Sequence, residues 1–280
     1  SVYARVQPEH KTRIVNQWRA AGYVTAMTGD GVNDAPSIKS ADIGIGMGIT
    51  GTDVTKNVAD MVLADDNFAT IVSAVEEGRR IYDNIRKAIQ FLLGSNMSEV
   101  ITIFVATLIG FNILEPVHLL WINLITDTLP ALALGMEKAE ADIMKRKPRD
   151  ANEGVFSGGL GFDVAYQGIL ISALVIISYG FGHMFETGAF GFGGSAHGTT
   201  MAFLTLSMAE IFHSFNLRSR EKSLFKIKGM NKMLNIAAIV SLALTTAVCE
   251  IPVLASAFDF TAVGAREYAT AALLGFCVIP

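Results

Sequence analysis

The sequence predicts a small α/β domain followed by an all-helical membrane bundle of about six transmembrane helices. Three observations predict this arrangement. The first 66 residues alternate short apolar strands with helices and glycine-rich loops. The remainder holds a series of long apolar segments with polar loops between them. Of all residues, 51% are hydrophobic and 17% are charged, a balance that is unusual for a soluble protein.

The elements of the α/β part can be placed from local patterns. The stretch PEHKTRIVNQWRAAG predicts an amphipathic helix, with Ile14, Val15 and Trp18 on one side and Gly22 as its end. Short strands are expected within YVTAMTGDG, ADIGIGMG and DMVLADD. Because short buried strands separated by helices favour a parallel sheet, we expect these three to pair in parallel.

A long helix without breaks is expected from Asn67 to Phe111. Its first part is amphipathic and charged, and its later part is apolar. About 40 helical residues span about 60 Å, which is more than a bilayer needs, so this helix should project into the cytoplasm. Further apolar segments lie near 116–136, 160–181, 199–217, 233–252 and 265–280. We therefore divide the chain into residues 1–66, 67–111 and 112–280.

The loops between the apolar segments differ in charge. Loops 137–159 and 218–232 are rich in Lys and Arg, whereas loop 182–198 has neither. Basic loops stay in the cytoplasm, so we expect a multi-pass integral membrane protein, embedded in lipid, with residues 1–66 on the cytoplasmic side. The net charge of −4 gives no reason to expect nucleic acid as a partner. The chain opens on Ser1 and stops within an apolar run, so we expect the C-terminal part of a larger protein.

The loop MTGDGVNDAP follows a predicted strand and carries the chemistry of the α/β part. Ligands of parallel sheets bind at the carboxyl ends of strands. Asp30 and Asp34 are four residues apart there, and Mg²⁺ is commonly held by carboxylates together with substrate phosphate. Asn33 can hydrogen-bond a phosphoryl oxygen, and Lys11 can neutralise its charge. The sequence therefore predicts a magnesium and phosphate site in this loop.

The stretches TGDGVNDAPSIKSADIGIGMG and PEHKTRIV resemble the hinge motif and the preceding Pro-x-x-Lys motif of P-type cation-transporting ATPases. The resemblance continues through VLADDNFATIVSAVEEGRRIYDNI into the apolar segments. It implies that residues 1–66 are the C-terminal part of a haloacid-dehalogenase-like phosphorylation domain. It makes 67–111 the stalk with the family's fifth span, and 112–280 spans six to ten, the last one truncated.

The resemblance also assigns roles in the phosphorylation site. It implies that Asp30 is a Mg²⁺ ligand, that Asp34 supports the site, and that Lys11 contacts the aspartyl phosphate. The residues lining the site would be Thr28, Gly29 and Asn33. The chain has no Asp-Lys-Thr-Gly-Thr or Thr-Gly-Glu-Ser string. The phosphorylated aspartate, most of the ATP site and the first four spans are thus expected upstream, and this fragment alone should be inactive.

Acidic and amide side chains recur inside two consecutive apolar segments. Asn96 and Glu99 are spaced i, i+3, and Asn123, Thr126 and Asp127 are spaced i, i+3, i+4. An acid at the centre of a membrane costs about 2.5–3.5 kcal/mol on insertion scales, so something should compensate. A hard cation bound by carboxylate and amide oxygens would do so. Pro130 has no N–H for the Thr126 carbonyl, which predicts a distorted helix at this place.

The stretches NMSEV and NLITDTLPALALGMEKAEADIMKRKPR resemble the calcium-pump branch of the family. The resemblance implies that Asn96, Glu99, Asn123, Thr126 and Asp127 are Ca²⁺ ligands, with further ligands from the missing fourth span. Two-site calcium pumps carry an acid where this chain has Ser207. Either Glu210 takes its place or one site is lost and the pump moves a single ion per ATP; a purely structural role for Glu210 is a further alternative.

The function expected from these patterns is export of Ca²⁺ from the cytosol by an ATP-driven pump with an aspartyl-phosphate intermediate, in a bacterial plasma membrane. Two alternatives stay open. The same class of pump could move Mn²⁺ or Na⁺, or the chain could be a non-catalytic membrane fragment. No Cys-Pro-Cys string lies in an apolar segment, which argues against export of copper or zinc.

Overall fold

The computed structural model describes residues 3–150, 153–219, 222–227 and 229–279, and the chain forms two compact units. The first unit runs from the N-terminus to Arg79 and also includes Ala141–Glu153. The second unit contains Arg80–Glu140 and the chain from Gly154 onward. The basic loop after residue 140 is therefore divided, and most of it belongs with the N-terminal unit.

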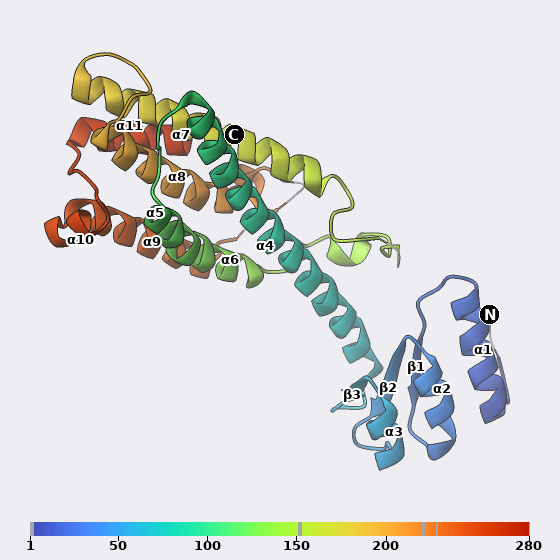
Figure 1. The fold of residues 1–280 in the computed structure, drawn as a ribbon. Coiled ribbons are helices and arrows are strands. Elements are labelled where there is room, and N and C mark those ends of the chain that lie inside the picture. Colours follow the sequence, from blue (N-terminus) through green and yellow to red (C-terminus); the bar gives the residue numbers. More distant parts are fainter. Residues whose placement is uncertain (1–2, 151–152, 220–221, 228, 280) are drawn as a thin grey trace. The chain divides into compact units, whose positions relative to one another are not determined.

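The first unit contains a three-stranded parallel sheet in the order β1-β2-β3 (Figure 1). The strands are β1 (Ala26–Gly29), β2 (Ile43–Met47) and β3 (Met61–Leu63), with Ala26 opposite Ile43 and Ile45 opposite Met61. All three predicted strands and their parallel pairing are confirmed. The connecting elements are η1 (Val32–Asp34), α2 (Ala35–Ser40) and α3 (Asp53–Val58).

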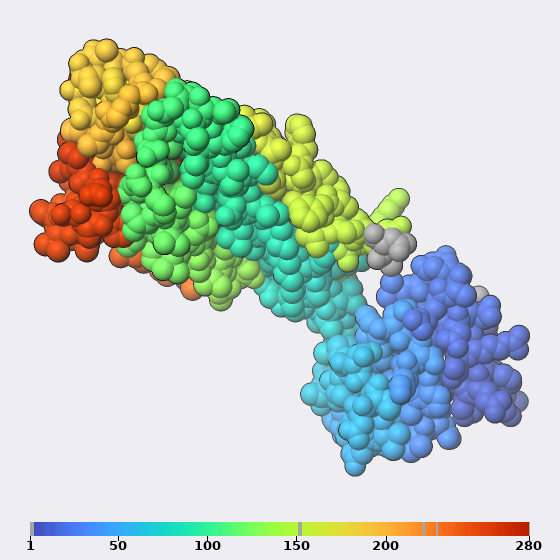
Figure 2. Space-filling view, in the orientation of Figure 1, coloured from blue at the N-terminus to red at the C-terminus, as the bar shows by residue number. Residues whose placement is uncertain are grey.

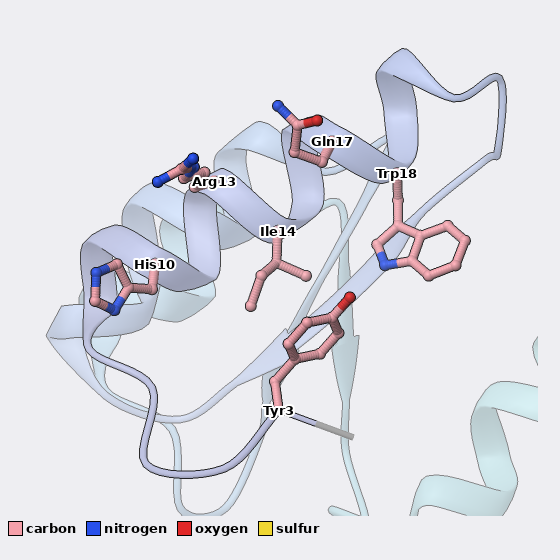
Figure 3. A pocket seen from close by; sticks show the side chains of 6 residues that line it. All are labelled: Tyr3, His10, Arg13, Ile14, Gln17 and Trp18. Carbon is pink, nitrogen blue, oxygen red and sulfur yellow. The ribbon is translucent and has the colours of Figure 1, made fainter. Parts of the chain in front are cut away.

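Helix α1 (Pro8–Ala20) begins at a proline in its first turn and ends before Gly22, as predicted. Gly22 has a φ of +85°, a left-handed conformation that glycine adopts without steric cost and that commonly ends helices. Val15 is buried, but Trp18 is 40% exposed. One side of α1 instead borders an open pocket of about 420 Å³, where the Tyr3 ring faces Ile14 (Figure 3). The pocket is lined by Tyr3, His10, Arg13, Ile14, Gln17 and Trp18.

The turn after β2 is held by the carboxylate of Asp66. The backbone N–H groups of Gly48 and Ile49 donate to Oδ1 at 2.6 and 3.0 Å, and that of Thr50 donates to Oδ2 at 2.7 Å. These hydrogen bonds, first that from Ile49, lower the pKa of Asp66 from 3.8 to about 2, against a smaller opposing effect of desolvation. The ionised carboxylate is therefore the form that this turn requires.

Acidification should release the turn at Gly48–Thr50. Because the pKa of Asp66 is lower in the folded chain than in the unfolded chain, its contribution is present above about pH 4 and is lost as the pH falls toward 2. Asp66→Ala should remove the amide protection of Ile49 and Thr50 already at about pH 5, measured by hydrogen–deuterium exchange, whereas the Gly48 amide keeps its hydrogen bond to the Leu63 carbonyl at 2.8 Å. Asp42→Ala, which removes an exposed carboxylate bonded to Thr25 instead, should leave that protection unchanged.

Helix α4 (Phe68–Ile109) is 42 residues long and has no break, close to the length that the sequence predicts. Within the second unit, one of its sides is buried and another is apolar and exposed. Figure 2 shows this part of α4 at the surface of that unit. Its exposed apolar residues include Leu93, Met97, Val100, Phe104 and Leu108, which recur at helical spacing.

The rest of the second unit is helical (Figure 1). Its elements are α5 (Pro116–Trp121), η2 (Ile122–Asp127), α6 (Thr128–Gly135), α7 (Leu160–Thr187), α8 (Ala196–Asn216), η4 (Leu224–Lys226), α9 (Lys232–Glu250), α10 (Pro252–Ala257) and α11 (Ala265–Phe276). The short η3 (Ile143–Lys145) lies in the loop that belongs to the first unit.

Helix α8 forms the centre of this bundle. It packs against α7, α9 and α11, and Phe203, Leu204 and Leu206 are fully buried. The main hydrophobic core surrounds it, with Tyr179 and Phe260 among its members. Because α8 is enclosed on nearly every side, each polar side chain on it needs a hydrogen-bond partner or a bound ligand inside the protein.

Four stretches of the described chain are long and apolar enough to cross a membrane. They are Phe68–Ile109, Pro116–Gly135, Leu160–Thr187 and Lys232–Glu250. Helix α11 has 12 residues, which rise about 18 Å, less than the thickness of a bilayer core. The described part of the chain is thus mostly helical, with four candidate membrane helices and a small parallel sheet; the six spans expected from the sequence are not confirmed.

Candidate functional sites in the sheet and in the helix bundle

The predicted phosphate loop lies at the carboxyl end of β1. Lys11, on α1, donates from Nζ to Asp34 Oδ1 at 2.6 Å. Asp34 is 7% exposed, and its carbonyl accepts a hydrogen bond from Ser37 Oγ at 2.8 Å. The structure therefore brings two of the predicted residues, 23 positions apart, into one ion pair.

Gly29 is required by the position of Asp34. A Cβ atom on Gly29 would lie 2.4 Å from the Asp34 Cβ, closer than such atoms approach. Asp30, the next residue, has an exposed side chain, while its carbonyl accepts a hydrogen bond from Thr52 N at 2.9 Å. Asn33 is also exposed, and Thr28 is half-buried. The loop thus presents one carboxylate and one amide outward beside the Lys11–Asp34 pair.

This donor set fits Mg²⁺ only in company with phosphate oxygens. Among the described residues, no group of three or more His, Cys, Asp or Glu side chains could hold a metal ion. Magnesium usually takes one or two carboxylates, keeps several waters and shares substrate phosphates. Asp30 supplies such a carboxylate, whereas the Asp34 carboxylate already accepts a hydrogen bond from Lys11.

The two polar faces predicted in the membrane segments do meet in the bundle. Asn123 Nδ2 donates to both carboxylate oxygens of Glu99, at 2.9 and 3.0 Å. The same nitrogen also donates to the Leu119 carbonyl at 2.9 Å. Glu99 is only 6% exposed, so a carboxylate and an amide from two different helices share a buried position.

Asp127 lies at a second buried position between the same two segments. Ser95 Oγ, on α4, donates to Asp127 Oδ2 at 2.7 Å. The other oxygen, Oδ1, has no hydrogen-bond partner, although Asp127 is 1% exposed. A buried carboxylate oxygen without a partner is costly, and a bound cation would satisfy it.

Glu210 contributes a third buried acid from α8. It is fully buried; Ser98 Oγ lies 3.4 Å from its Oε1, and its Oε2 has no partner. Ser207, on the same helix, is also buried and its hydroxyl has no partner. The structure thus brings Glu210 of α8 to Ser98 of α4, while the described Glu99, Asp127 and Glu210 do not by themselves form a group that could hold a metal ion.

Asn96 and Thr126 do not point into this group. Asn96 is exposed, and its Nδ2 donates to the Leu92 carbonyl of its own helix at 2.6 Å. Thr126 is buried, and its Oγ1 donates back to the Ile122 carbonyl at 2.8 Å. Their roles as cation ligands remain predictions.

The helix that carries Asp127 is irregular, as Pro130 predicts. Residues Ile122–Asp127 form a π-helical turn between α5 and α6, and Thr128 Oγ1 donates to the Asn123 carbonyl at 2.9 Å. Such turns replace i→i+4 by i→i+5 bonding and occur frequently at functional sites. The irregularity coincides with the three residues that the sequence singled out in this segment.

Two serines of the buried group, Ser95 and Ser98, were missed by sequence reasoning. Each hydroxyl contacts an acid on another element, Asp127 and Glu210 respectively. Ser95 precedes Glu99 by four residues, so helical spacing alone places both on one face. That spacing is the signal that could have identified it.

Known proteins match both the helical part and the whole chain. Residues 111–280 match the family described as "Cation transporting ATPase, C-terminus". The chain belongs to this family. It is 48% identical to calcium-transporting ATPase 1 of Bacillus cereus, over all of this chain and 32% of that protein. Over its full length the chain is also 43% identical to a calcium-transporting ATPase of Listeria monocytogenes, of which it covers 31%. It is 37% identical to an endoplasmic reticulum-type calcium-transporting ATPase of Arabidopsis thaliana, of which it covers 30%.

The chain thus spans about a third of the length of these relatives. Its membership of this family, its similarity to these relatives and its apolar helices mark it as the C-terminal portion of a cation-transporting ATPase and as an integral membrane protein. The resemblance read from the motifs is confirmed by these matches.

Proposed function

We propose that the intact protein is an ATP-driven pump that exports Ca²⁺ from the cytosol through an aspartyl-phosphate intermediate. The observation that carries this proposal is the pair of buried contacts Asn123–Glu99 and Ser95–Asp127 inside membrane helices. Carboxylate, amide and hydroxyl oxygens are the ligands that Ca²⁺ prefers. The names of the relatives, calcium-transporting ATPases, support the same cation.

Further ligands would come from parts of the protein that precede this chain. Asn96 lies beside the exposed apolar residues of α4, including Met97 and Val100. We infer that a preceding span covers this side and that Asn96 then faces the cation together with Glu99. Glu210 would complete the site from α8, and Thr126 would contribute oxygen from the π-helical turn.

The α/β part would be the C-terminal portion of a haloacid-dehalogenase-like phosphorylation domain, followed by six spans. Mg²⁺ would neutralise phosphate charge and orient the phosphoryl group, with Asp30 as its protein ligand and ATP held mainly by upstream domains. Lys11 would face the phosphoryl oxygens, with Asp34 fixing its position through the 2.6 Å ion pair. Asn33 would donate a hydrogen bond to the same oxygens, and Thr28 and Gly29 would line the site.

The proposed topology places residues 1–66 in the cytoplasm of a bacterial cell. Arg79 Nη1 donates to the carbonyls of Ile143 and Arg146 at 2.8 and 3.0 Å. The part of the basic loop that contains Ile143 and Arg146 is therefore hydrogen-bonded to Arg79, in the same compact unit as the phosphate loop. This supports the assignment of both to one side of the membrane, in agreement with the excess of Lys and Arg.

The proposal is tested with the full-length protein in membrane vesicles. Phosphoenzyme formation from ATP should require Ca²⁺ and should not occur when Mn²⁺ or Na⁺ replaces it. Activation by Mn²⁺ or Na⁺ alone would show a different cation as substrate. Formation of a phosphoenzyme that depends on no cation would contradict a transport role for the buried acids.

A further inference from the structure

A buried ion pair lies apart from the cation-site residues, just after α6. Arg218 Nε and Nη2 donate to Glu137 Oε2 and Oε1, at 3.0 and 3.1 Å. The pair is therefore bidentate. Both side chains are only 9% exposed, so the pair is largely removed from water. Such planar, two-bond pairs fix orientation as well as distance.

Helix α9 joins the same carboxylate through its first residues. Asn231 is the N-cap of α9, and its Oδ1 accepts the hydrogen bond of Leu234 N at 3.0 Å. Its Nδ2 donates to Glu137 Oε2 at 2.9 Å and to the Ala133 carbonyl of α6 at 3.0 Å. Asn231 therefore ties the end of α6 and the start of α9 to Glu137.

Helix α4 approaches from the backbone side of the same residue. Asn84 Nδ2 donates to the carbonyls of Glu137 and Gly135, at 2.7 and 3.2 Å. Arg80 Nη1 donates to the Glu137 carbonyl at 3.1 Å. Asn84 is 2% exposed, so these bonds too are buried.

The elements that meet at Glu137 are those that carry the three buried membrane acids. Helix α4 carries Glu99, 15 residues or about 22 Å beyond Asn84. Asp127 ends the π-helical turn that leads directly into α6. Arg218 follows Glu210 by eight residues, just past the end of α8. Glu137 contacts all three elements, because it lies just after α6, its carboxylate accepts hydrogen bonds from Arg218, and its backbone carbonyl accepts one from Asn84 of α4.

The charge state of Glu137 suits this role. Burial alone would raise the pKa of Glu137. The hydrogen bonds from Arg218 and Asn231, together with the positive charges of Arg218 and Lys87, have the larger effect, so the pKa is lowered. Glu137 is therefore an anion at neutral pH, and it holds Arg218 by charge as well as by geometry.

We propose that Glu137 and Arg218 are positioning residues for cation binding, because their ion pair ties the end of α6 to the end of α8 and so sets where Asp127 and Glu210 lie relative to Glu99 on α4. This inference rests on the proposed transport function. It assigns the pair no contact with the cation. The pair acts through the helix ends, in the way that groups behind metal ligands tune affinity without touching the metal.

The test uses the full-length protein in membranes with the variants Glu137→Gln, Arg218→Met and the double variant Glu137→Met/Arg218→Met. The quantities measured are the Ca²⁺ concentration for half-maximal phosphoenzyme formation, the maximal phosphoenzyme level per folded protein, and phosphorylation by inorganic phosphate without Ca²⁺. We expect each single variant to need about tenfold more Ca²⁺, with the other two quantities unchanged.

The double variant separates positioning from stability. Replacing both members of a buried ion pair with apolar residues often leaves stability unchanged, because no buried charge is left without its partner. We expect the double variant to fold in normal amount and to keep the weakened Ca²⁺ affinity. Lys222→Met is the matched control. It removes the half-exposed Lys222–Glu140 pair at 3.2 Å, and we expect it to leave affinity unchanged.

Two results would overturn the inference while the transport function stands. One is wild-type affinity in all variants, and the other is recovery of normal affinity in the double variant, which would reduce the pair to a stabilising contact. If the unaltered protein itself formed no Ca²⁺-dependent phosphoenzyme, the proposed function would fail, and the inference would fail with it.

Discussion

Asp127→Asn in the full-length protein should abolish Ca²⁺-dependent phosphoenzyme formation. The change keeps the size of the side chain and an oxygen for the Ser95 hydroxyl, but it removes the negative charge beside the oxygen that has no partner. Groups that merely orient a metal ligand already change affinity by about 10- to 100-fold, so loss of a ligand charge should exceed 100-fold. The measurement is phosphoenzyme formed from ATP over a Ca²⁺ titration.

Ser172→Ala provides the matched control for Asp127→Asn. Ser172 is buried on α7, and its hydroxyl has no hydrogen-bond partner in the described part of the chain. Its removal should leave the titration unchanged. An Asp127→Asn protein with the Ca²⁺ dependence of the unaltered pump would exclude Asp127 from the cation site.

Gly29→Ala should slow phosphorylation strongly while Ca²⁺ binding persists. The added Cβ would meet Asp34 at 2.4 Å, and it can be accommodated only if Asp34 moves and the 2.6 Å ion pair with Lys11 is disturbed. Overpacking of this kind costs about 1–3 kcal/mol, and each 1.4 kcal/mol corresponds to about tenfold in rate. If the full cost appears in the rate, the phosphoenzyme should form about 5- to 140-fold more slowly, with equilibrium binding of radioactive calcium unchanged.

Gly78→Ala is the control, because a Cβ at that helical position meets no atom within 4 Å. It should leave both phosphorylation and Ca²⁺ binding as they are. Normal phosphorylation by Gly29→Ala would mean that the Lys11–Asp34 geometry does not matter for the reaction.

The elements of the α/β part could be predicted because their signals are local. Pro8 and Gly22 mark the two ends of α1, and three short apolar runs give the three strands. The contact between Asn123 and Glu99 followed from helical spacing on two segments, each readable by itself. Spacing alone does not show which face of a helix packs against the rest of the protein. Asn96 shares helical proximity with Glu99, yet it lies exposed in the described chain.

Contacts between distant segments could not be predicted from the sequence. Glu137 and Arg218 are 81 residues apart, and both read as ordinary members of basic, polar loops. Nothing local distinguishes a buried loop charge from a solvated one, since the difference is made by the helices that enclose it. Ser98 is similar, because its partner Glu210 is 112 residues away.

The π-helical turn has a consequence for the phase of the apolar pattern. One additional residue in a turn of a 3.6-residue helix rotates everything after it by about 100°. A single helical wheel drawn through Pro116–Gly135 would therefore assign Ala133 and Leu134 to faces that they do not occupy, although both are buried. The segment must therefore be analysed as two helical pieces whose residue positions are counted from different starting points, with Asp127 at the junction between them.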